Sequence, residues 1–429
     1  MQRYVGIDFG TTNSAVAVAE GTGQPSLVSF PSRAGPTETF RSVLYFDPDH
    51  RNARGLLEPL VGPRAIECYL DGHGDGRLIQ SVKSYVASRS FVATSVFERK
   101  YTLEDLVALI LRGLREASPQ GLLAEGAKVV VGRPVRFAHA DTAEDDAFAV
   151  ARLRRALQTA GFGEVTFELE PVAAAWYYSS TLDHDELCLI GDFGGGTSDF
   201  SLMRAGPNAA ASAAGPILGT EGVALAGDAF DGRIVDRLVS PRLGLGSEYR
   251  AYFDAKTIPV PAWIYAKLRR WHHLSFLKSR ETMRLLRELE AQAEEPEKLA
   301  ALVHLVESDL GYELYRAIER AKVGLSSAAH ATFDFHDPPV DLGAEVERAS
   351  FEAWIDDELC QIAACVDRLL EKTGVSAGDV GSVFLTGGSS FVPAVRALFE
   401  RRFGAKKLRG GNEMTSVALG LALRAREVG

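Results

Sequence analysis

The amino-acid sequence predicts an α/β protein built from two similar lobes. Strand-like and helix-like segments alternate along most of the chain, and a hairpin segment near the N-terminus has a second copy near the middle. Alternation of this kind is typical of proteins in which helices pack on a sheet. The repeated hairpin indicates that the two lobes share one construction.

The repeated segment is a strand, a turn and a second strand. The first copy joins the apolar segments Tyr4–Phe9 and Ser14–Ala19 through Gly10-Thr11-Thr12-Asn13, and Asp8 lies at the end of its first strand. The second copy joins Leu187–Gly191 to Phe200–Arg204 through Asp192-Phe193-Gly194-Gly195-Gly196-Thr197-Ser198. Glycine-rich turns between β-branched or apolar runs are hairpin signals.

The remaining elements follow from hydrophobic periodicity and from helix start and stop signals. Strands are expected at Ser26–Phe30, Ser42–Phe46, Lys128–Gly132, Val165–Leu169 and Val380–Leu385, and helices at Leu103–Glu116, Thr142–Gly161, Pro171–Ser180, Val392–Phe403 and Thr415–Glu427.

The predicted domain boundaries place lobe I at residues 1–186, closed by a C-terminal helix at 412–429, and lobe II at 187–411. A helical elaboration of lobe II is expected at about 240–325, where Leu299 to Ile318 form an apolar stripe at helical spacing. The elaboration is either a decoration or a surface for a partner. Aromatic residues at its start favour a partner surface, but such residues are more often core; they are Trp263, Tyr265, Trp271, His272 and His273.

Bulk composition excludes several classes of function. The 429-residue chain has a net charge of -10, so nucleic acid or an anionic membrane is an unexpected main partner. Its four cysteines form no C-x-x-C pair, which argues against a zinc site or a disulfide framework. We find no signal peptide and no run of about 18 apolar residues, and therefore expect a cytoplasmic protein with no membrane span.

The two turns carry the residue types that a nucleoside triphosphate site needs. Glycine lets backbone N–H groups approach phosphate oxygens, and hydrated Mg²⁺ needs one or two carboxylates. Asp8 and Asp192, each followed by glycine and threonine, supply this set twice. No G-x-x-x-x-G-K-[ST] loop and no H-R-D catalytic loop occurs, which excludes a P-loop protein and a protein kinase.

With these residues in view, the sequence resembles the nucleotide-binding domain of the 70-kDa heat-shock chaperone (DnaK) family, most of all its short bacterial YegD-type branch. The resemblance implies an actin-like ATPase fold, with two lobes of duplicated ribonuclease-H-like subdomains around a nucleotide cleft. Six blocks carry it in the family's order: Gly6–Ser14, Ser81–Tyr85, Glu170–Ala175, Asp192–Asp199, Glu319–Ser327 and Leu385–Ser390.

The resemblance implies roles for individual residues on the phosphate side, with ATP or ADP and Mg²⁺ as cofactors. Lys83 would lie near the γ-phosphate and the attacking water, and Glu170 would position magnesium and water. Asp8 and Asp192 would hold hydrated magnesium, with Asp199 completing the carboxylate set. Pro134 would lie beside the catalytic centre. The phosphate turns would be formed by Gly10, Thr11, Thr12 and Asn13, and by Gly194, Gly195, Gly196 and Thr197.

The same resemblance implies a nucleoside side, where the sequence departs from the family. Glu319, Lys322 and Ser326 would contact ribose and adenine, with Gly387, Gly388 and Ser389 behind the nucleoside. The two arginines that usually sandwich the adenine are replaced by Val323 and Phe391. Phe391 can still stack on a base, but the guanidinium contribution is lost, which weakens the expected adenine preference.

The expected function is that of a slow ATPase switch, related to chaperones, that acts on a protein client or co-chaperone. The chain stops after the helix Thr415–Glu427, and we expect no peptide-binding domain. A non-hydrolysing nucleotide sensor or scaffold remains open, and so does an actin-like filament subunit or sugar kinase of the same superfamily. The Lys83 block and the Glu319 helix favour the chaperone branch.

Overall fold

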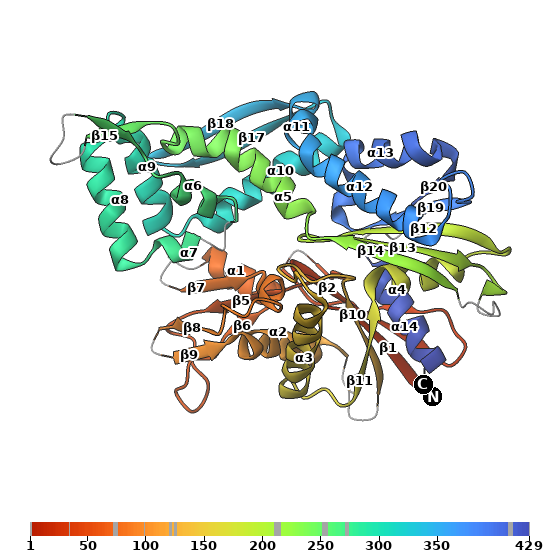
Figure 1. Cartoon of the computed structure of the whole chain (residues 1–429). Helices are drawn as coiled ribbons and strands as arrows, with labels where there is room; N and C mark the ends of the chain where they lie inside the picture. The colour runs from red at the N-terminus through yellow and green to blue at the C-terminus, as the bar shows by residue number, and fades with distance from the viewer. Residues whose placement is uncertain are drawn as a thin grey trace. The chain divides into compact units, whose positions relative to one another are not determined.

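The computed structural model describes residues 2–33, 35–71, 76–97, 99–119, 122–123, 127–209, 216–250, 256–270, 274–410 and 415–428. The chain divides into two compact units (Figure 1). The first unit contains Met1–Ala226, Gln361–Ser390 and Val395–Gly429, and the second contains Gly227–Cys360 and Phe391–Ala394. This division differs from the predicted lobes, whose boundary at residue 186 stays a prediction.

The first sheet of the first unit has the strand order β11-β10-β1-β2-β3, with β4 also paired to β2. Strand β1 is antiparallel to β2 and parallel to β10, which is in turn parallel to β11. The bounds are β1 Arg3–Asp8, β2 Asn13–Glu20, β3 Ser26–Leu27, β4 Phe40–Arg41, β10 Lys128–Arg133 and β11 Val165–Leu169. The predicted strand at Ser26–Phe30 is wrong beyond Leu27, because Phe30 makes only an isolated bridge to Thr37.

The second sheet repeats this arrangement within the same unit. Strand β12 (Glu186–Phe193) is antiparallel to β13 (Ser198–Ala205) and parallel to β19 (Ser382–Thr386). The outer strands are β14 (Ile217–Val223) and β20 (Leu408–Arg409). Both sheets therefore contain an antiparallel hairpin with a parallel neighbour, which confirms the duplicated hairpin.

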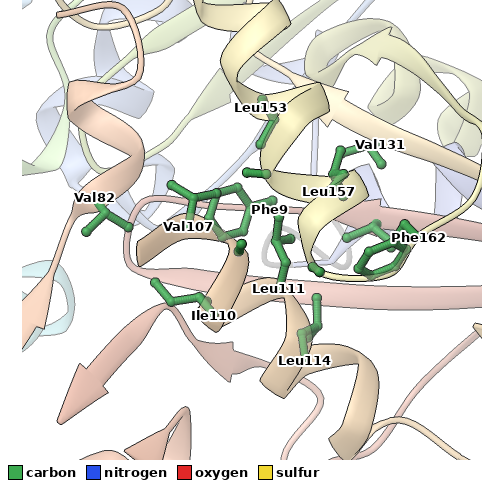
Figure 2. Close-up of a cluster of buried hydrophobic side chains, with 14 of the residues drawn as sticks. Phe9, Val82, Val107, Ile110, Leu111, Leu114, Val131, Leu153, Leu157 and Phe162 are labelled. Atoms are coloured by element: carbon green, nitrogen blue, oxygen red, sulfur yellow. The ribbon is translucent and has the colours of Figure 1, made fainter. Parts of the chain in front are cut away.

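Helices α2 (Leu103–Ala117) and α3 (Ala143–Thr159) pack side by side against the core of the first sheet (Figure 1). Each begins with a capping box, Thr102 with Asp105 and Thr142 with Asp145, which satisfies N–H groups of the first turn. Figure 2 shows their apolar side chains around Phe9. Val82 points into the same cluster. Phe9, which follows Asp8, and Val82, which precedes Lys83, thus lie in the same hydrophobic core.

Helices α4 (Glu170–Ser179) and α14 (Ser416–Val428) pack directly against each other. Helix α14 lies on β1, β2 and β10, while α4 lies on β12 and β13. The approach is so close that a Cβ atom added to Gly420 would lie 1.7 Å from the carbonyl oxygen of Ala173. This packing requires glycine and joins the two sheets. The predicted C-terminal helix is confirmed from Ser416 onward, while 412–414 and 429 lie outside the described residues.

The other elements of the first unit surround these sheets. They are β5 (Val43–Phe46), β6 (Leu60–Val61), β7 (Arg77–Gln80), β8 (Ala93–Val96), β9 (Arg99–Thr102), α1 (Pro63–Asp71), the 3-10 turns η1 (Val82–Tyr85) and η7 (Ala405–Lys407), and α13 (Pro393–Phe403), which begins in the second unit.

The second unit is mainly helical, as the sequence predicts for 240–325. Its predicted apolar stripe lies on two helices, α9 (Pro296–Glu307) and α10 (Gly311–Ser327), because Asp309 has φ 58° and ends the first. Trp271, His272 and His273 lie outside the described residues. The remaining elements are α5 (Gly227–Ile234), η3 (Val235–Val239), η4 (Ser240–Leu243), β15 (Glu248–Arg250), β16 (Thr257–Pro259), α6 (Ala262–Leu268), α7 (Leu274–Leu277), α8 (Arg280–Gln292), β17 (His330–Asp337), β18 (Val340–Glu347), α11 (Arg348–Trp354) and α12 (Asp356–Thr373), which leads back into the first unit.

Every helix in the described part of the chain is too short or too polar to cross a lipid bilayer.

Candidate functional site

Five ionisable side chains of the first unit influence one another strongly enough to form one electrostatic cluster. They come from five different elements, which the two sheets and helix α4 bring together. Asp8 ends β1, Lys83 lies in η1, Glu170 begins α4, Asp192 lies near the end of β12, and Asp199 lies near the start of β13.

The centre of this acidic cluster is an ion pair. Nζ of Lys83 lies 2.7 Å from Oε1 of Glu170, and the two side chains are only 8% and 9% exposed. Burial disfavours the ammonium form, but attraction to Glu170 and Asp8 outweighs burial and raises the pKa of Lys83. Lys83 is therefore held positively charged where its stem has little freedom to move.

The carboxylates around this pair carry more negative charge than Lys83 can balance. Burial, followed by repulsion from Glu170, raises the pKa of Asp8 to about 7. Burial and repulsion from Glu170 and Asp8 also raise the pKa of Asp192 well above its usual value. A cation bound near these groups would relieve the repulsion.

The donor set fits a hydrated magnesium ion. Within the described part of the chain, no three acidic, histidine or cysteine side chains converge closely enough to hold a metal directly. Mg²⁺ usually keeps several waters and binds proteins through one or two carboxylates plus substrate phosphates. Asp8 and Asp192 are therefore suited to hold such an ion through water, with the phosphates supplying further oxygens.

Asp199 has a different environment, although it lies directly opposite Asp192 in the β12–β13 hairpin. Its Oδ1 accepts hydrogen bonds from the backbone amides of Val135 at 2.9 Å and Arg136 at 3.4 Å. Burial is the main cause that raises its pKa to about 7. Asp199 thus ties β13 to the segment that follows Pro134, a role that the sequence did not predict because it depends on amides distant in the chain.

Both hairpin turns contain glycine and are at least partly exposed. At Gly10 an added Cβ would lie 2.0 Å from the carbonyl oxygen of Asn13, so the first turn requires glycine. In the second turn the amide of Gly194 donates to the carbonyl of Thr197 at 3.0 Å. Gly194 is exposed. The other turn residues are partly exposed: Thr11, Thr12, Asn13, Gly195, Gly196 and Thr197.

A third loop packs against the second turn. Gly387 has φ 84°, and a Cβ atom there would lie 2.1 Å from the carbonyl oxygen of Phe193. Gly388 and Ser389 begin the following 3-10 turn η6 (Gly388–Phe391), and Oγ of Ser389 donates to the carbonyl of Gly194 at 3.4 Å. The Gly387 to Ser389 segment is therefore brought to the β12–β13 turn within the first unit.

The predicted nucleoside residues on α10 belong to the second unit, and their place beside the phosphate turns stays a prediction. Glu319 is exposed, and Ser326 donates to the carbonyl of Lys322 at 3.1 Å. Val323 and Phe391 are 61% and 45% exposed, as contacts for a planar base would need to be.

Lys322 has a partner that sequence reasoning missed. Its Nζ lies 2.7 Å from Oδ1 of Asp231, and both side chains are mostly buried. Burial raises the pKa of Asp231 to about 6 although Lys322 opposes the shift. Asp228 and Asp231 are three residues apart on α5 and so lie on the same face of the helix. Two carboxylates on one face were the sequence signal that could have indicated a basic partner.

Comparison with known proteins finds similarity to the Hsp70 family. The family model described as Hsp70 protein matches residues 304–427. Chaperone protein DnaK of Deinococcus proteolyticus is 26% identical over 449 residues, and the match covers 99% of this chain and 59% of that protein. Both findings support an Hsp70-family nucleotide-binding domain in this chain.

A second relative shows the same level of similarity. Chaperone protein DnaK of Deinococcus radiodurans is 26% identical over 450 residues, with the same shares of both chains covered. The fold is therefore the actin-like ATPase fold of the Hsp70 family. The chain spans about three fifths of the length of these curated relatives. Membership of the short YegD-type branch stays a prediction.

Proposed function

We propose that this Hsp70-family protein binds ATP with Mg²⁺ and hydrolyses it slowly to ADP and phosphate. The observation that carries the proposal is the buried Lys83–Glu170 pair, surrounded by the carboxylates Asp8 and Asp192. This arrangement lies in the same unit as the two glycine turns, which suit phosphate binding.

The phosphates would be held by backbone amides of the Gly10–Asn13 and Gly194–Thr197 turns and by the hydroxyls of Thr11, Thr12 and Thr197. Bound Mg²⁺ would neutralise charge on the phosphate oxygens. Asp8 and Asp192 would hold its water molecules, and the charge of the cation would favour their ionised forms against the burial and the repulsion that raise the pKa of each.

In the proposed reaction a water oxygen forms a bond to the γ-phosphorus, and the bond between this phosphorus and the β–γ bridging oxygen breaks. ADP leaves with that oxygen, and the proton of the water ends on phosphate or in solvent. Lys83 would stabilise the charge on the transferring oxygens, and Glu170 would keep the ammonium in place. Positioning and electrostatics supply most of the catalysis in phosphoryl transfer.

We further propose that hydrolysis acts as a switch read by a protein client or co-chaperone. A nucleotide that bridged the two predicted lobes would favour the closed conformation by binding it more tightly. A switch needs the bound nucleotide to persist, which is why we expect slow turnover. Both relatives are named chaperone proteins, which supports a chaperone-related role.

The test is single-turnover hydrolysis of ATP and of GTP by the purified protein with Mg²⁺, together with the affinity for each nucleotide. Tight binding with slow hydrolysis of ATP is the expected result. Binding without turnover would favour the nucleotide sensor instead, and failure of both nucleotides to bind would overturn the proposal. The ratio of the affinities for ATP and GTP measures how much preference for adenine remains with Val323 and Phe391 in place of the two arginines.

A further inference from the structure

A cavity of about 410 Å³ lies in the first unit, beside helices α2 and α3, which pack side by side (Figure 1). Its lining includes Arg89 and Val92 from the segment before β8, Glu104 from α2, and Phe148, Arg152 and Arg155 from α3. None of these residues is part of the candidate nucleotide site. The volume falls in the range that small-molecule sites usually have, roughly 300–1,000 Å³.

The inner wall of the cavity is formed by a partly buried ion pair between Arg152 and Glu104. The Arg152 side chain is 5% exposed and donates from Nε and Nη2 to the two oxygens of Glu104 at 3.0 and 3.2 Å. Arg152 also donates to the carbonyls of Ser88 at 2.9 Å and Phe91 at 3.1 Å. This fork holds the wall of the cavity in place, and its charge is already neutralised.

The outer part of the cavity has a positive charge that the pair does not balance. Arg155 is 55% exposed, and in the described structure its only hydrogen bond goes to Glu104 at 3.2 Å, an oxygen that Arg152 already occupies. Arg89 is paired with Asp145 at 3.1 Å. The guanidinium of Arg155 is therefore available to a ligand, within a chain whose net charge is -10.

Apolar side chains stand beside this charge. Val92 is 66% exposed, which is high for a large aliphatic residue at a cavity. The Phe148 ring contacts two cations, with the guanidinium carbons of Arg89 and Arg152 at 4.6 and 5.1 Å from its centroid. The cavity thus combines the half-exposed Arg155 guanidinium, which shares its one acidic partner Glu104 with Arg152, with an apolar wall.

We propose that this cavity binds a small organic anion that carries one carboxylate on an apolar body. The carboxylate would accept hydrogen bonds from Arg155, whose planar fork matches its geometry. The apolar body would cover Val92 and the edge of Phe148 and remove their surface from water. One negative charge is enough, because Arg89 is paired with Asp145, while Arg152 and Arg155 share the single carboxylate of Glu104 and leave one positive charge in excess.

The experiment titrates the full-length protein with 2-naphthoate and, separately, with its neutral analogue 2-naphthamide, and measures binding by calorimetry and ligand-observed NMR. Naphthoate should bind at least about tenfold more tightly than the amide, which corresponds to one charge-assisted contact. Arg155→Glu and Val92→Asp should each weaken naphthoate binding by about tenfold or more. Arg64→Glu is the matched control, because Arg64 is exposed on α1 outside the cavity. The affinity of this variant for 2-naphthoate should equal that of the parent protein.

Equal affinity for acid and amide, unchanged binding in both cavity variants, or no binding of naphthoate would overturn the proposal. The acid–amide comparison uses the unaltered protein, so it decides even if a variant folds poorly. ATP affinity is measured in parallel. If the protein binds naphthoate but not ATP, the proposed ATPase function is refuted while the proposed cavity site stands.

Discussion

The ammonium of Lys83 and the carboxylate of Glu170 form a buried ion pair at 2.7 Å between a 3-10 turn and the first residue of helix α4. The two residues are 87 positions apart in the chain. Removal of Lys83 would leave Glu170 as a buried charge without its ion-pair partner, which is destabilising. Under the proposed function, the pair also holds the ammonium in place for catalysis.

Lys83→Ala is expected to retain nucleotide binding and to lose most hydrolysis, about a hundredfold or more, because the charge on the transferring oxygens would no longer be stabilised. It should also lower the free energy of unfolding by about 3 kcal/mol, since Glu170 is left unpaired. Single-turnover kinetics and urea unfolding measure the two effects. Lys100→Ala, at an exposed lysine of β9, is the control. Equal hydrolysis by Lys83→Ala and the parent protein would refute the role of Lys83.

Asp192→Ala is expected to remove most of the magnesium-dependent part of nucleotide affinity without unfolding the chain. Asp192 is crowded by Glu170, Asp8 and Asp199, so the loss of one carboxylate relieves repulsion in the free protein. Calorimetric titration with ADP, with and without Mg²⁺, separates the metal-dependent part. Asp183→Ala changes a carboxylate that is 98% exposed and should have no effect. Unchanged affinity of Asp192→Ala would reject the site assignment.

The unfolding free energy of the nucleotide-free protein should depend on pH through Asp8 and Asp199. Each has a pKa raised from 3.8 to about 7, so in this window the folded state binds protons that the unfolded chain has released. Their contribution to stability is therefore present at low pH and is lost as pH rises toward 7.

Asp199→Asn isolates one of these contributions, because the amide oxygen can still accept from Val135 and Arg136. The free energy of unfolding of the variant minus that of the parent should rise by an amount on the order of 1–3 kcal/mol as the pH is raised from 5 to 8. Urea midpoints across this range provide the measurement. A parent–variant difference that does not change with pH would show that Asp199 is ionised throughout.

Gly420→Ala tests the packing of α14 on α4. In an isolated helix this substitution stabilises by about 1 kcal/mol, but here the new methyl group would lie 1.7 Å from a backbone oxygen. We expect a net destabilisation on the order of 1–3 kcal/mol in urea unfolding. Gly163→Ala has no atom within 4 Å of the added Cβ and serves as the control. A stabilised Gly420→Ala protein would mean that the two helices do not pack this tightly.

The sequence predicts the secondary structure well where periodicity is strong. The two hairpins, the helix from Leu103 and the strand from Lys128 agree with the structure within a few residues. The prediction at Ser26–Phe30 was wrong past Leu27, because apolar character alone does not reveal whether a neighbouring strand is available for pairing.

Within the site, sequence blocks suggested which residue types to examine but not how they interact. The Lys83–Glu170 pair and the amides that hold Asp199 join segments far apart in the chain, and no local pattern encodes such distances. Lys322 illustrates the limit most clearly. The family resemblance implies a contact between Lys322 and the nucleoside, whereas the structure pairs Lys322 with Asp231, so the nucleoside contact stays a prediction.

Arg152 donates to the carbonyl of Ser88, five residues after Lys83, and so fastens the stretch of backbone that leaves the η1 turn. One arginine on α3 therefore constrains both the wall of a cavity and the exit of the turn that presents the buried ammonium. A substitution of Arg152 should therefore disturb the cavity and the backbone after the η1 turn together, whereas a change of Val92 should disturb the cavity alone.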